Sequence, residues 1–164
     1  VASTPVCAEP AAAQADTAAV WYDDWNAGLA AAKEQHRPVL VDFFTDACGG
    51  CKWMHENVFT DPAIVERMKA SWVGIRVNTG RVDVIADWKG KTYKYYEIAK
   101  HFRVIGVPTF LFFDSDGEPV QTVVGGKDAA MFGDILDFFA ERAYERDISF
   151  KAFRDEKHGS SDPG

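Results

Sequence analysis

The sequence has few cysteines, no long basic run and no long apolar run. Three cysteines in 164 residues are too few for the disulfide scaffold that holds many small secreted domains together. The formal net charge is −7, so the chain lacks the positive surface that nucleic-acid binding needs, and we expect no nucleic-acid partner. No apolar run approaches the ~18 residues of a transmembrane helix, so we predict no membrane span.

The chain does have enough apolar residues to fold without disulfides. Hydrophobic residues make up 47% and aromatic residues 13% of the sequence, which suits a single domain with a real core. We predict this domain over residues 21–153. Residues 1–20, rich in Ala, Thr and Pro, are expected to form a mobile tail, and residues 154–164 a flexible C-terminal tail.

The first residue is Val rather than Met. A mature exported protein often begins this way after its signal peptide is removed, although a shortened chain would look the same. We therefore expect a periplasmic or otherwise exported protein, with a cytoplasmic location as the alternative.

Hydrophobic patterns predict alternating helices and strands. Short apolar strands are predicted at residues 39–44, 72–77, 109–113 and 120–124. Helices are predicted at about residues 24–35, through 51–55, from 61, at 95–102 and from 128. Two central strands with helical connections should be parallel, and the last two strands should form a hairpin. The prediction is an α/β sandwich with one mixed sheet, and with a polar, turn-rich insertion around Arg81–Thr92 that reads as a loop or ribbon.

Two cysteines lie two residues apart in the stretch "FFTDACGGCK", where a buried strand ends and a helix begins. The amino end of a helix favours an anion, and Lys52 adds a positive charge, so the Cys48 thiolate should form readily. Gly49 and Gly50 allow the tight bend that a disulfide across this spacing requires. The pattern predicts that Cys48 attacks a substrate disulfide and that Cys51 resolves the mixed disulfide.

The pair could instead be a structural clip or part of a metal site. A structural clip is disfavoured because the core needs no staple and the pair bridges almost no chain. His55 lies four residues after Cys51, so Cys48, Cys51 and His55 form a weak candidate metal set that lacks a fourth ligand; the alternative for His55 is an ordinary surface histidine. Cys7 lies in the predicted tail, either incidental or available for an intermolecular disulfide.

Two segments resemble the signatures of thioredoxin-fold proteins, namely "VDFFTDACGGCK" and "GVPTFLFFDSDGE". The resemblance implies that Asp42 is a buried acid serving as proton acceptor for the resolving cysteine, and that Val107-Pro108 is a cis-proline pair shaping the substrate site. It also implies that Arg76 supplies a positive charge near the buried acid and that Gly125 follows the hairpin. From the residues alone, Asp42 and Arg76 could instead be solvated surface charges.

The longer pattern "CKWMHENVFTDPAIV" looks most like exported thioredoxin-like proteins and the C-terminal domain of the Dsb electron transporter, over about Trp21 to Ala143. This resemblance implies a thiol:disulfide oxidoreductase, favoured as a reductase or electron relay. An oxidase or isomerase is the first alternative, and a metal-binding or partner-binding module the second. The implied partners are protein dithiols or disulfides and an upstream thiol-redox protein, with no cofactor and a monomeric chain.

Three features bear on how the site is used. Trp53, just after the pair, is expected to touch a partner. The family usually has Trp where this chain has Ala47, and Pro where it has Gly50. Because residues around the cysteines influence the reduction potential, these departures leave the direction of electron flow open.

Overall fold

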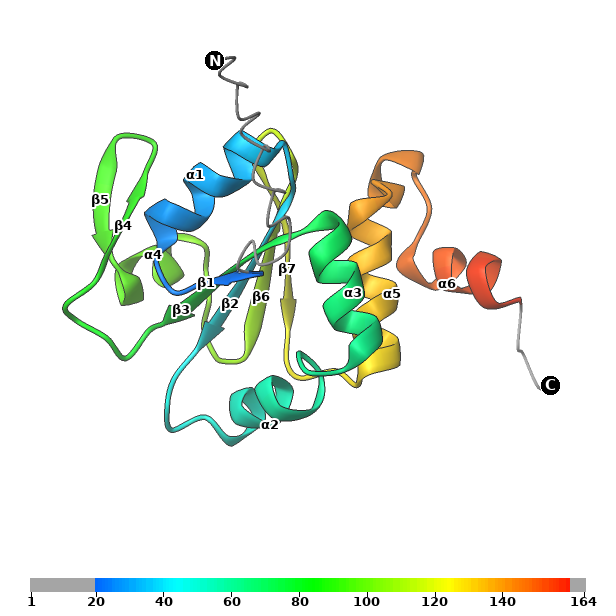
Figure 1. Cartoon of the computed structure of the whole chain (residues 1–164), viewed down its shortest axis with the longest axis horizontal. Coiled ribbons are helices and arrows are strands. Elements are labelled where there is room, and N and C mark those ends of the chain that lie inside the picture. The colour runs from blue at the N-terminus through cyan, green and yellow to red at the C-terminus, as the bar shows by residue number, and fades with distance from the viewer. Residues whose placement is uncertain (1–19, 160–164) are drawn as a thin grey trace, which may run out of the picture.

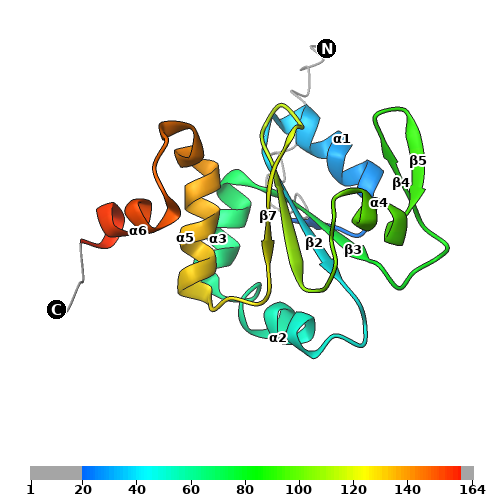
Figure 2. The same ribbon diagram turned by 180° about the vertical axis from the view of Figure 1, so that it is seen from behind.

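The computed structural model describes residues 20–159 and contains a five-stranded mixed sheet with helices on both faces (Figures 1 and 2). The strands of this sheet are β1 (Trp21–Tyr22), β2 (Val39–Phe44), β3 (Val73–Asn78), β6 (Thr109–Phe113) and β7 (Pro119–Val124). A separate ribbon consists of β4 (Ile85–Trp88) and β5 (Lys91–Lys94). The helices are α1 (Trp25–Gln35), α2 (Gly49–Asn57), α3 (Pro62–Ser71), α4 (Tyr95–His101), α5 (Ala129–Ala140), the short 3₁₀ helix η1 (Ala143–Arg146) and α6 (Phe150–His158).

The sheet has the strand order β1-β3-β2-β6-β7. Strands β1, β2 and β3 are parallel to one another, and β6 and β7 form an antiparallel hairpin beside β2. The mixed sheet and the hairpin predicted from the sequence are therefore confirmed. The second long strand begins at Val73 and ends at Asn78, one residue later at each end than predicted.

The predicted helix starts follow ordinary capping chemistry. Asp24, Asp61 and Asp128 each accept a hydrogen bond from a backbone N–H in the first turn of α1, α3 and α5. Pro62 occupies the first position of α3, where its missing N–H costs no helical hydrogen bond. The side chains thus satisfy donors that the start of a helix leaves free.

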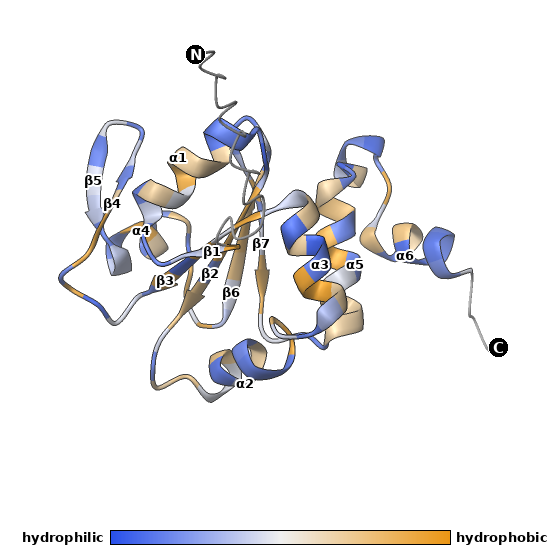
Figure 3. Cartoon of the chain, in the orientation of Figure 1, coloured by the Kyte–Doolittle hydropathy of each residue, from blue (hydrophilic) through white to orange (hydrophobic). Residues whose placement is uncertain are grey.

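Two apolar clusters cover the two faces of the sheet. Helices α1 and α4 lie on one side with the β4–β5 ribbon, and α3 and α5 lie on the other (Figures 1 and 2). The central strands carry hydrophobic residues along much of their length, as expected for strands covered on both faces (Figure 3).

Alternation along β2 decides which way its one charged residue points. Val39, Val41 and Phe43 belong to the cluster under α1, whereas Leu40 belongs to the cluster under α3 and α5. Since successive side chains of a strand point to opposite faces, Asp42 shares the face of Leu40, beneath α2 and away from α1.

The predicted insertion is a ribbon packed on α1. Asn26 and Asp87 exchange two hydrogen bonds, at 2.9 and 2.8 Å, and the Trp25 indole N–H donates to the Asp87 carbonyl at 3.0 Å. Ala86, on β4 of the ribbon, is fully buried. The insertion therefore contributes to the core around α1 and lies away from α2 (Figure 1).

The C-terminal end differs from the prediction. The helix capped by Asp128 is followed by η1 and α6, and α6 continues to His158, so the flexible tail expected from residue 154 is wrong for residues 154–158. Phe153 is 4% exposed and packs on the hydrophobic cluster of α5. The two-residue strand β1 was also missed, because so short a strand has no periodicity to read. The predicted tail before Val20, with Cys7, lies outside the described residues.

Charged side chains of α6 converge on one buried carboxylate of α5. Asp134 is 3% exposed, and accepts from Arg154 Nε at 2.8 Å. His158 Nε2 lies 2.8 Å from the same carboxylate and Lys157 Nζ lies 3.4 Å from it. Burial of Asp134 opposes its ionisation, but the hydrogen bonds and charges from α6 outweigh burial and lower the pKa of Asp134.

Candidate active site

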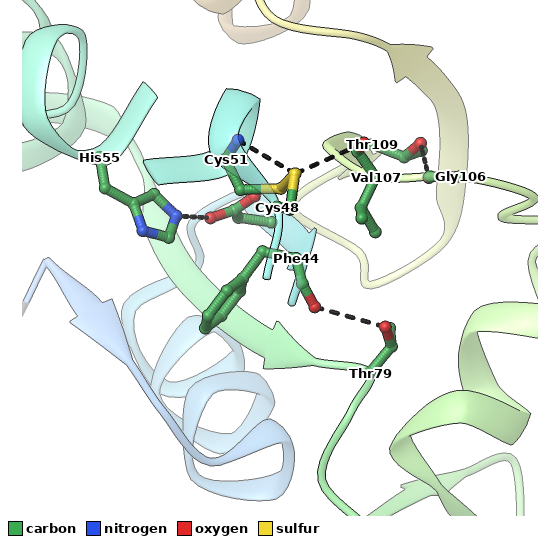
Figure 4. Close-up of a disulfide and its surroundings, with 9 residues drawn as sticks. Phe44, Cys48, Cys51, His55, Thr79, Gly106, Val107 and Thr109 are labelled. Atoms are coloured by element: carbon green, nitrogen blue, oxygen red, sulfur yellow. Dashed lines mark hydrogen bonds and ion pairs between the residues drawn. A yellow bond between two sulfur atoms is a disulfide. The ribbon is translucent and has the colours of Figure 1, made fainter. Parts of the chain in front are cut away.

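Cys48 and Cys51 form a disulfide at the amino end of α2 (Figure 4). Cys48 is the N-cap residue, and its sulfur accepts a hydrogen bond from the Cys51 backbone N–H at 3.1 Å. Cys48 is half-buried, while Cys51 is 1% exposed. A thiolate at Cys48 would therefore be stabilised by a helix N-terminus and remain accessible to a partner, as the sequence predicts.

The loop before β6 forms the other side of the disulfide. The Val107–Pro108 peptide bond is cis, and the Val107 carbonyl oxygen lies 3.6 Å from the Cys48 sulfur. The Pro108 carbonyl accepts a hydrogen bond from the Gly125 N–H at 2.9 Å, which ties this loop to the end of β7. Gly50 faces Pro108, and a Cβ at position 50 would lie in ordinary contact with the proline ring, 3.7 Å away. Residues 48–51 and 107–108 thus meet across the disulfide, although more than fifty residues separate them in sequence.

Asp42 is the buried acid of the site, with 1% of its surface exposed. One carboxylate oxygen, Oδ2, lies 2.6 Å from Nε2 of His55, while Oδ1 has no hydrogen-bond partner among the described residues. Burial raises the pKa of Asp42, and the hydrogen bond and charge of His55, with a smaller effect from Arg76, offset only part of that rise. The interpretation of Asp42 as a surface charge is therefore wrong.

His55 is the site residue that the sequence placed in the wrong role. Its side chain is 23% exposed, and its ring packs between Phe44 and Phe59, with centroids 5.0 and 5.5 Å away. The surface-histidine interpretation is thus wrong, because the ring reaches inward to Asp42 (Figure 4). The available signal was the i,i+4 spacing from Cys51 together with an acid on the strand below.

His55 is also not arranged as a metal ligand with the cysteines. Its Nε2 is directed at Asp42, and the two cysteine sulfurs are bonded to each other. Within residues 20–159, no group of three or more His, Cys, Asp or Glu side chains is placed to hold a metal ion.

The two predicted positive charges differ in position. Arg76 pairs with Asp42 in the register of β2 and β3, but its guanidinium lies over the Trp21 ring, 5.1 Å from the centroid, and makes no hydrogen bond to Asp42. Lys52 is 73% exposed and lies 3.8 Å from Glu56. Arg76 therefore acts on Asp42 only through its charge, and Lys52 belongs to the solvent face of α2.

Exposed apolar side chains occur on three segments that adjoin the disulfide. Trp53, two residues after Cys51, is 47% exposed, and Ile105, just before the Val107–Pro108 loop, is 97% exposed. Val124, which precedes Gly125, is 62% exposed. The sequence predicted the exposure of Trp53 but gave no reason to single out Ile105 or Val124, because an isolated apolar residue in a loop reads the same whether buried or exposed.

The comparisons with known proteins agree with this fold. Residues 25–140 match the family model of the Thioredoxin-like domain, and the chain belongs to this family. The thioredoxin fold inferred from the two signatures is thereby confirmed. No helix among residues 20–159 has both the length and the apolar composition needed to cross a membrane.

Two curated relatives are thiol:disulfide interchange proteins DsbD. The chain is 34% identical to the Salmonella typhi protein over 118 residues, covering 71% of this chain and 19% of the relative. It is 33% identical to the protein of Escherichia coli strain K12 over 112 residues, covering 67% and 18%. The chain thus spans about a fifth of the length of the curated relatives it matches.

Solved structures support the fold independently. A thioredoxin from Thermus thermophilus superimposes with a TM-score of 0.56 at 25% identity, covering 87% of this chain and 97% of that one. The oxidised C-terminal domain of DsbD from Neisseria meningitidis gives 0.51 at 20% identity, covering 78% and 99%. A thioredoxin-fold protein from Helicobacter pylori gives 0.62 at 18% identity, covering 75% and 85%, which at this identity speaks for the fold alone.

Proposed function

We propose that this protein is a thiol:disulfide oxidoreductase that exchanges disulfides with protein substrates through Cys48 and Cys51. The observation that carries the proposal is the asymmetry of the pair. Cys48 is the accessible N-cap of α2 beside the Val107 carbonyl, whereas Cys51 is buried one turn deeper. That asymmetry supports an attacking role for Cys48 and a resolving role for Cys51.

In the reductive direction, the Cys48 thiolate attacks one sulfur of a substrate disulfide. A bond forms between Cys48 and that sulfur, the substrate S–S bond breaks, and the second substrate sulfur leaves as a thiolate. Cys51 then gives up its proton, with Asp42 as the proposed acceptor, and its sulfur attacks Cys48. The Cys48–Cys51 disulfide forms, the substrate is released with two electrons more than before, and its thiolates take protons from water.

The partner surface is proposed to surround this disulfide. Val107 and Pro108 provide one wall, Gly49 and Gly50 leave the opposite side free of side chains, and Trp53 offers an exposed ring. A polypeptide beside the disulfide would find the apolar surface that protein partners generally use at the centre of an interface.

A reductase or electron-relay role is the preferred direction, supported by the likeness to thiol:disulfide interchange proteins. Oxidase or isomerase activity is the alternative, since Ala47 and Gly50 are the positions where this chain departs from its family. No cofactor is required, because the electrons pass through the cysteines. We propose a periplasmic or otherwise exported location, because disulfides of substrate proteins form and persist in such compartments.

The test compares matched single-cysteine variants. Cys48→Ser should no longer catalyse the reduction of insulin disulfides by dithiothreitol. Cys51→Ser should instead accumulate a mixed disulfide with the substrate, visible on a non-reducing gel. Full reductase activity in Cys48→Ser would sink the proposal. Equilibration in glutathione buffers then gives the reduction potential of the Cys48–Cys51 pair. A strongly oxidising potential, together with the ability to refold a scrambled protein, would favour an oxidase or isomerase over a reductase.

A further inference from the structure

The resolving cysteine and His55 lie on α2, and the buried acid meets His55 from the strand below. Cys51 and His55 lie one helical turn apart on α2, so their side chains share a face of the helix. Asp42 reaches this face from β2, where its Oδ2 lies 2.6 Å from His55 Nε2. Cys51 and Asp42 are each 1% exposed, whereas the His55 side chain is 23% exposed. The imidazole is thus the member of the three that borders both the buried interior and the solvent.

The hydrogen-bond pattern leaves one free position at each end of the Asp42–His55 pair. Asp42 Oδ1 is buried and has no hydrogen-bond partner among the described residues. At the other end, His55 Nε2 is occupied by Asp42, and Nδ1 makes no hydrogen bond to another described residue. An unpaired buried carboxylate oxygen is unfavourable in a resting protein, so its retention suits a group that accepts a proton during a reaction.

We propose that Asp42 and His55 form a proton relay that connects Cys51 with solvent, in which His55 is the positioning residue that keeps Asp42 ready to accept a proton. This inference rests on the proposed function, because it concerns the step in which Cys51 resolves the mixed disulfide.

The proton balance of that step explains why a histidine is useful there. Cys51 transfers its proton to Asp42 Oδ1, and the Cys51 sulfur attacks Cys48 and displaces the substrate thiolate. In the proposed relay, protonated His55 gives up its Nδ1 proton to water as the carboxylate takes up the proton of Cys51. The net charge of the buried pair is unchanged, and when the disulfide is reduced again the same transfers run in reverse.

Among the described residues, His55 is the side chain that hydrogen-bonds Asp42. From β3, Arg76 contributes charge but no hydrogen bond. Around His55, the packed rings of Phe44 and Phe59 carry no charge. Lys52 and Glu56 lie at the solvent surface of α2, where they pair with each other.

The test separates the two thiol steps with 5,5′-dithiobis(2-nitrobenzoate) and the full reduced chain carrying Cys7→Ser. Attack by Cys48 releases the first thionitrobenzoate, and resolution by Cys51 releases the second, so stopped-flow absorbance reports each step. His55→Gln keeps an N–H donor for Asp42 but cannot carry a proton. We expect it to slow the second release about tenfold between about pH 6 and 7, while changing the first release less than about twofold.

The pH profile distinguishes a relay from a structural contact. The difference between His55→Gln and the parent should shrink as the pH rises toward about 9, because the solvent is then a better proton acceptor and the step depends less on His55. Asp42→Asn should slow the same phase, and the double variant should be no slower than Asp42→Asn, because both residues serve one transfer. His101→Gln, an exposed histidine on α4, is the matched control and should leave both phases unchanged.

If the second release of thionitrobenzoate has the same pH profile in His55→Gln and in the parent, the relay is overturned. Equal slowing of both releases would also overturn it, because that result indicates a distorted site. If the parent itself releases no second thionitrobenzoate, the proposed function fails, and the relay fails with it. If the parent reduces disulfides and His55→Gln does so at the same rate, the relay is disproved while the proposed function stands.

Discussion

Asp42 and Asp134 are both buried aspartates, yet their surroundings give them opposite properties. Within residues 20–159, Asp42 has one hydrogen-bonding partner and a second oxygen with none, and burial raises its pKa. Asp134 on α5 meets three basic side chains from α6, which overcome burial and lower its pKa. The difference teaches that the number of partners, more than burial itself, separates a carboxylate that stabilises the fold from one kept ready for chemistry.

The two aspartates should also leave opposite marks on stability. The folded state holds the proton of Asp42 more tightly than the unfolded chain does. Asp42 therefore destabilises the fold by an amount that grows as the pH rises from about 4 through the raised pKa of the folded state. Asp134 holds its proton less tightly in the folded state. Its stabilising effect is present above about pH 4 and is lost as pH falls through its lowered pKa.

The largest change in stability is expected at the contact between α5 and α6, where it tests whether apolar packing or charge holds α6. Phe153 is 4% exposed, and its ring lies 5.4 Å from that of Phe138. Phe153→Ala should lower the free energy of unfolding by about 3 kcal/mol, because it leaves a cavity between α5 and α6. Urea unfolding measures the loss, and Phe150→Ala, in which a half-buried ring is removed, serves as the milder control. A loss smaller than that of Asp134→Ala would mean that the charges dominate.

Asp134→Ala should cost about 2 kcal/mol at pH 7, because it removes charge-assisted hydrogen bonds from a buried site. The basic partners are partly exposed and can turn to water, which limits the loss. Chemical unfolding from pH 7 down to about pH 3 should show the gap to the parent closing in acid. A gap that stays constant across this range would contradict the assignment of Asp134 as a stabilising anion.

Asp42→Asn should change stability in the other direction. Burial opposes the ionised form of Asp42, so replacing it with a neutral amide should raise the free energy of unfolding by about 1 to 2 kcal/mol at pH 8 and by less at pH 5. The same variant should resolve mixed disulfides slowly, so it trades activity for stability. Thermal unfolding at the two pH values measures the gain. If Asp42→Asn is the less stable protein at pH 8, the contrast between the two aspartates is lost.

The smallest change in stability is expected at His158, which contacts Asp134 as His55 contacts Asp42. His158 is 51% exposed, so His158→Gln should cost at most about 0.5 kcal/mol, as exposed ion pairs usually do, and should leave disulfide exchange unchanged. His55→Gln is expected to alter the exchange kinetics instead. Parallel unfolding and stopped-flow measurements on both variants provide the check, and a slow resolving step in His158→Gln would argue against a local relay.

Local patterns in the sequence were sufficient for most of the fold. The apolar strands, the helix starts near residues 24, 61 and 128, and the bend between Cys48 and Cys51 each depend on neighbours within a few residues, and these features were predicted correctly. The contact of His55 with Asp42 depends on how α2 lies over β2, which no local pattern specifies. Helix α6 was missed because its polar, lysine-containing sequence resembles a solvated tail, and its stability comes from Asp134 and the apolar side of α5.

The short strand β1 also bears on how copies of this chain meet at high concentration. An exposed strand edge can pair with another molecule, and proteins often avoid this with short edge strands or prolines. Here β1 covers only Gly74 and Ile75 of β3, and the opposite edge strand begins with Pro119, which has no N–H to donate. We therefore expect neither edge to extend the sheet into a second copy, so a chain that exposes its disulfide to partners keeps its strand edges protected from aggregation.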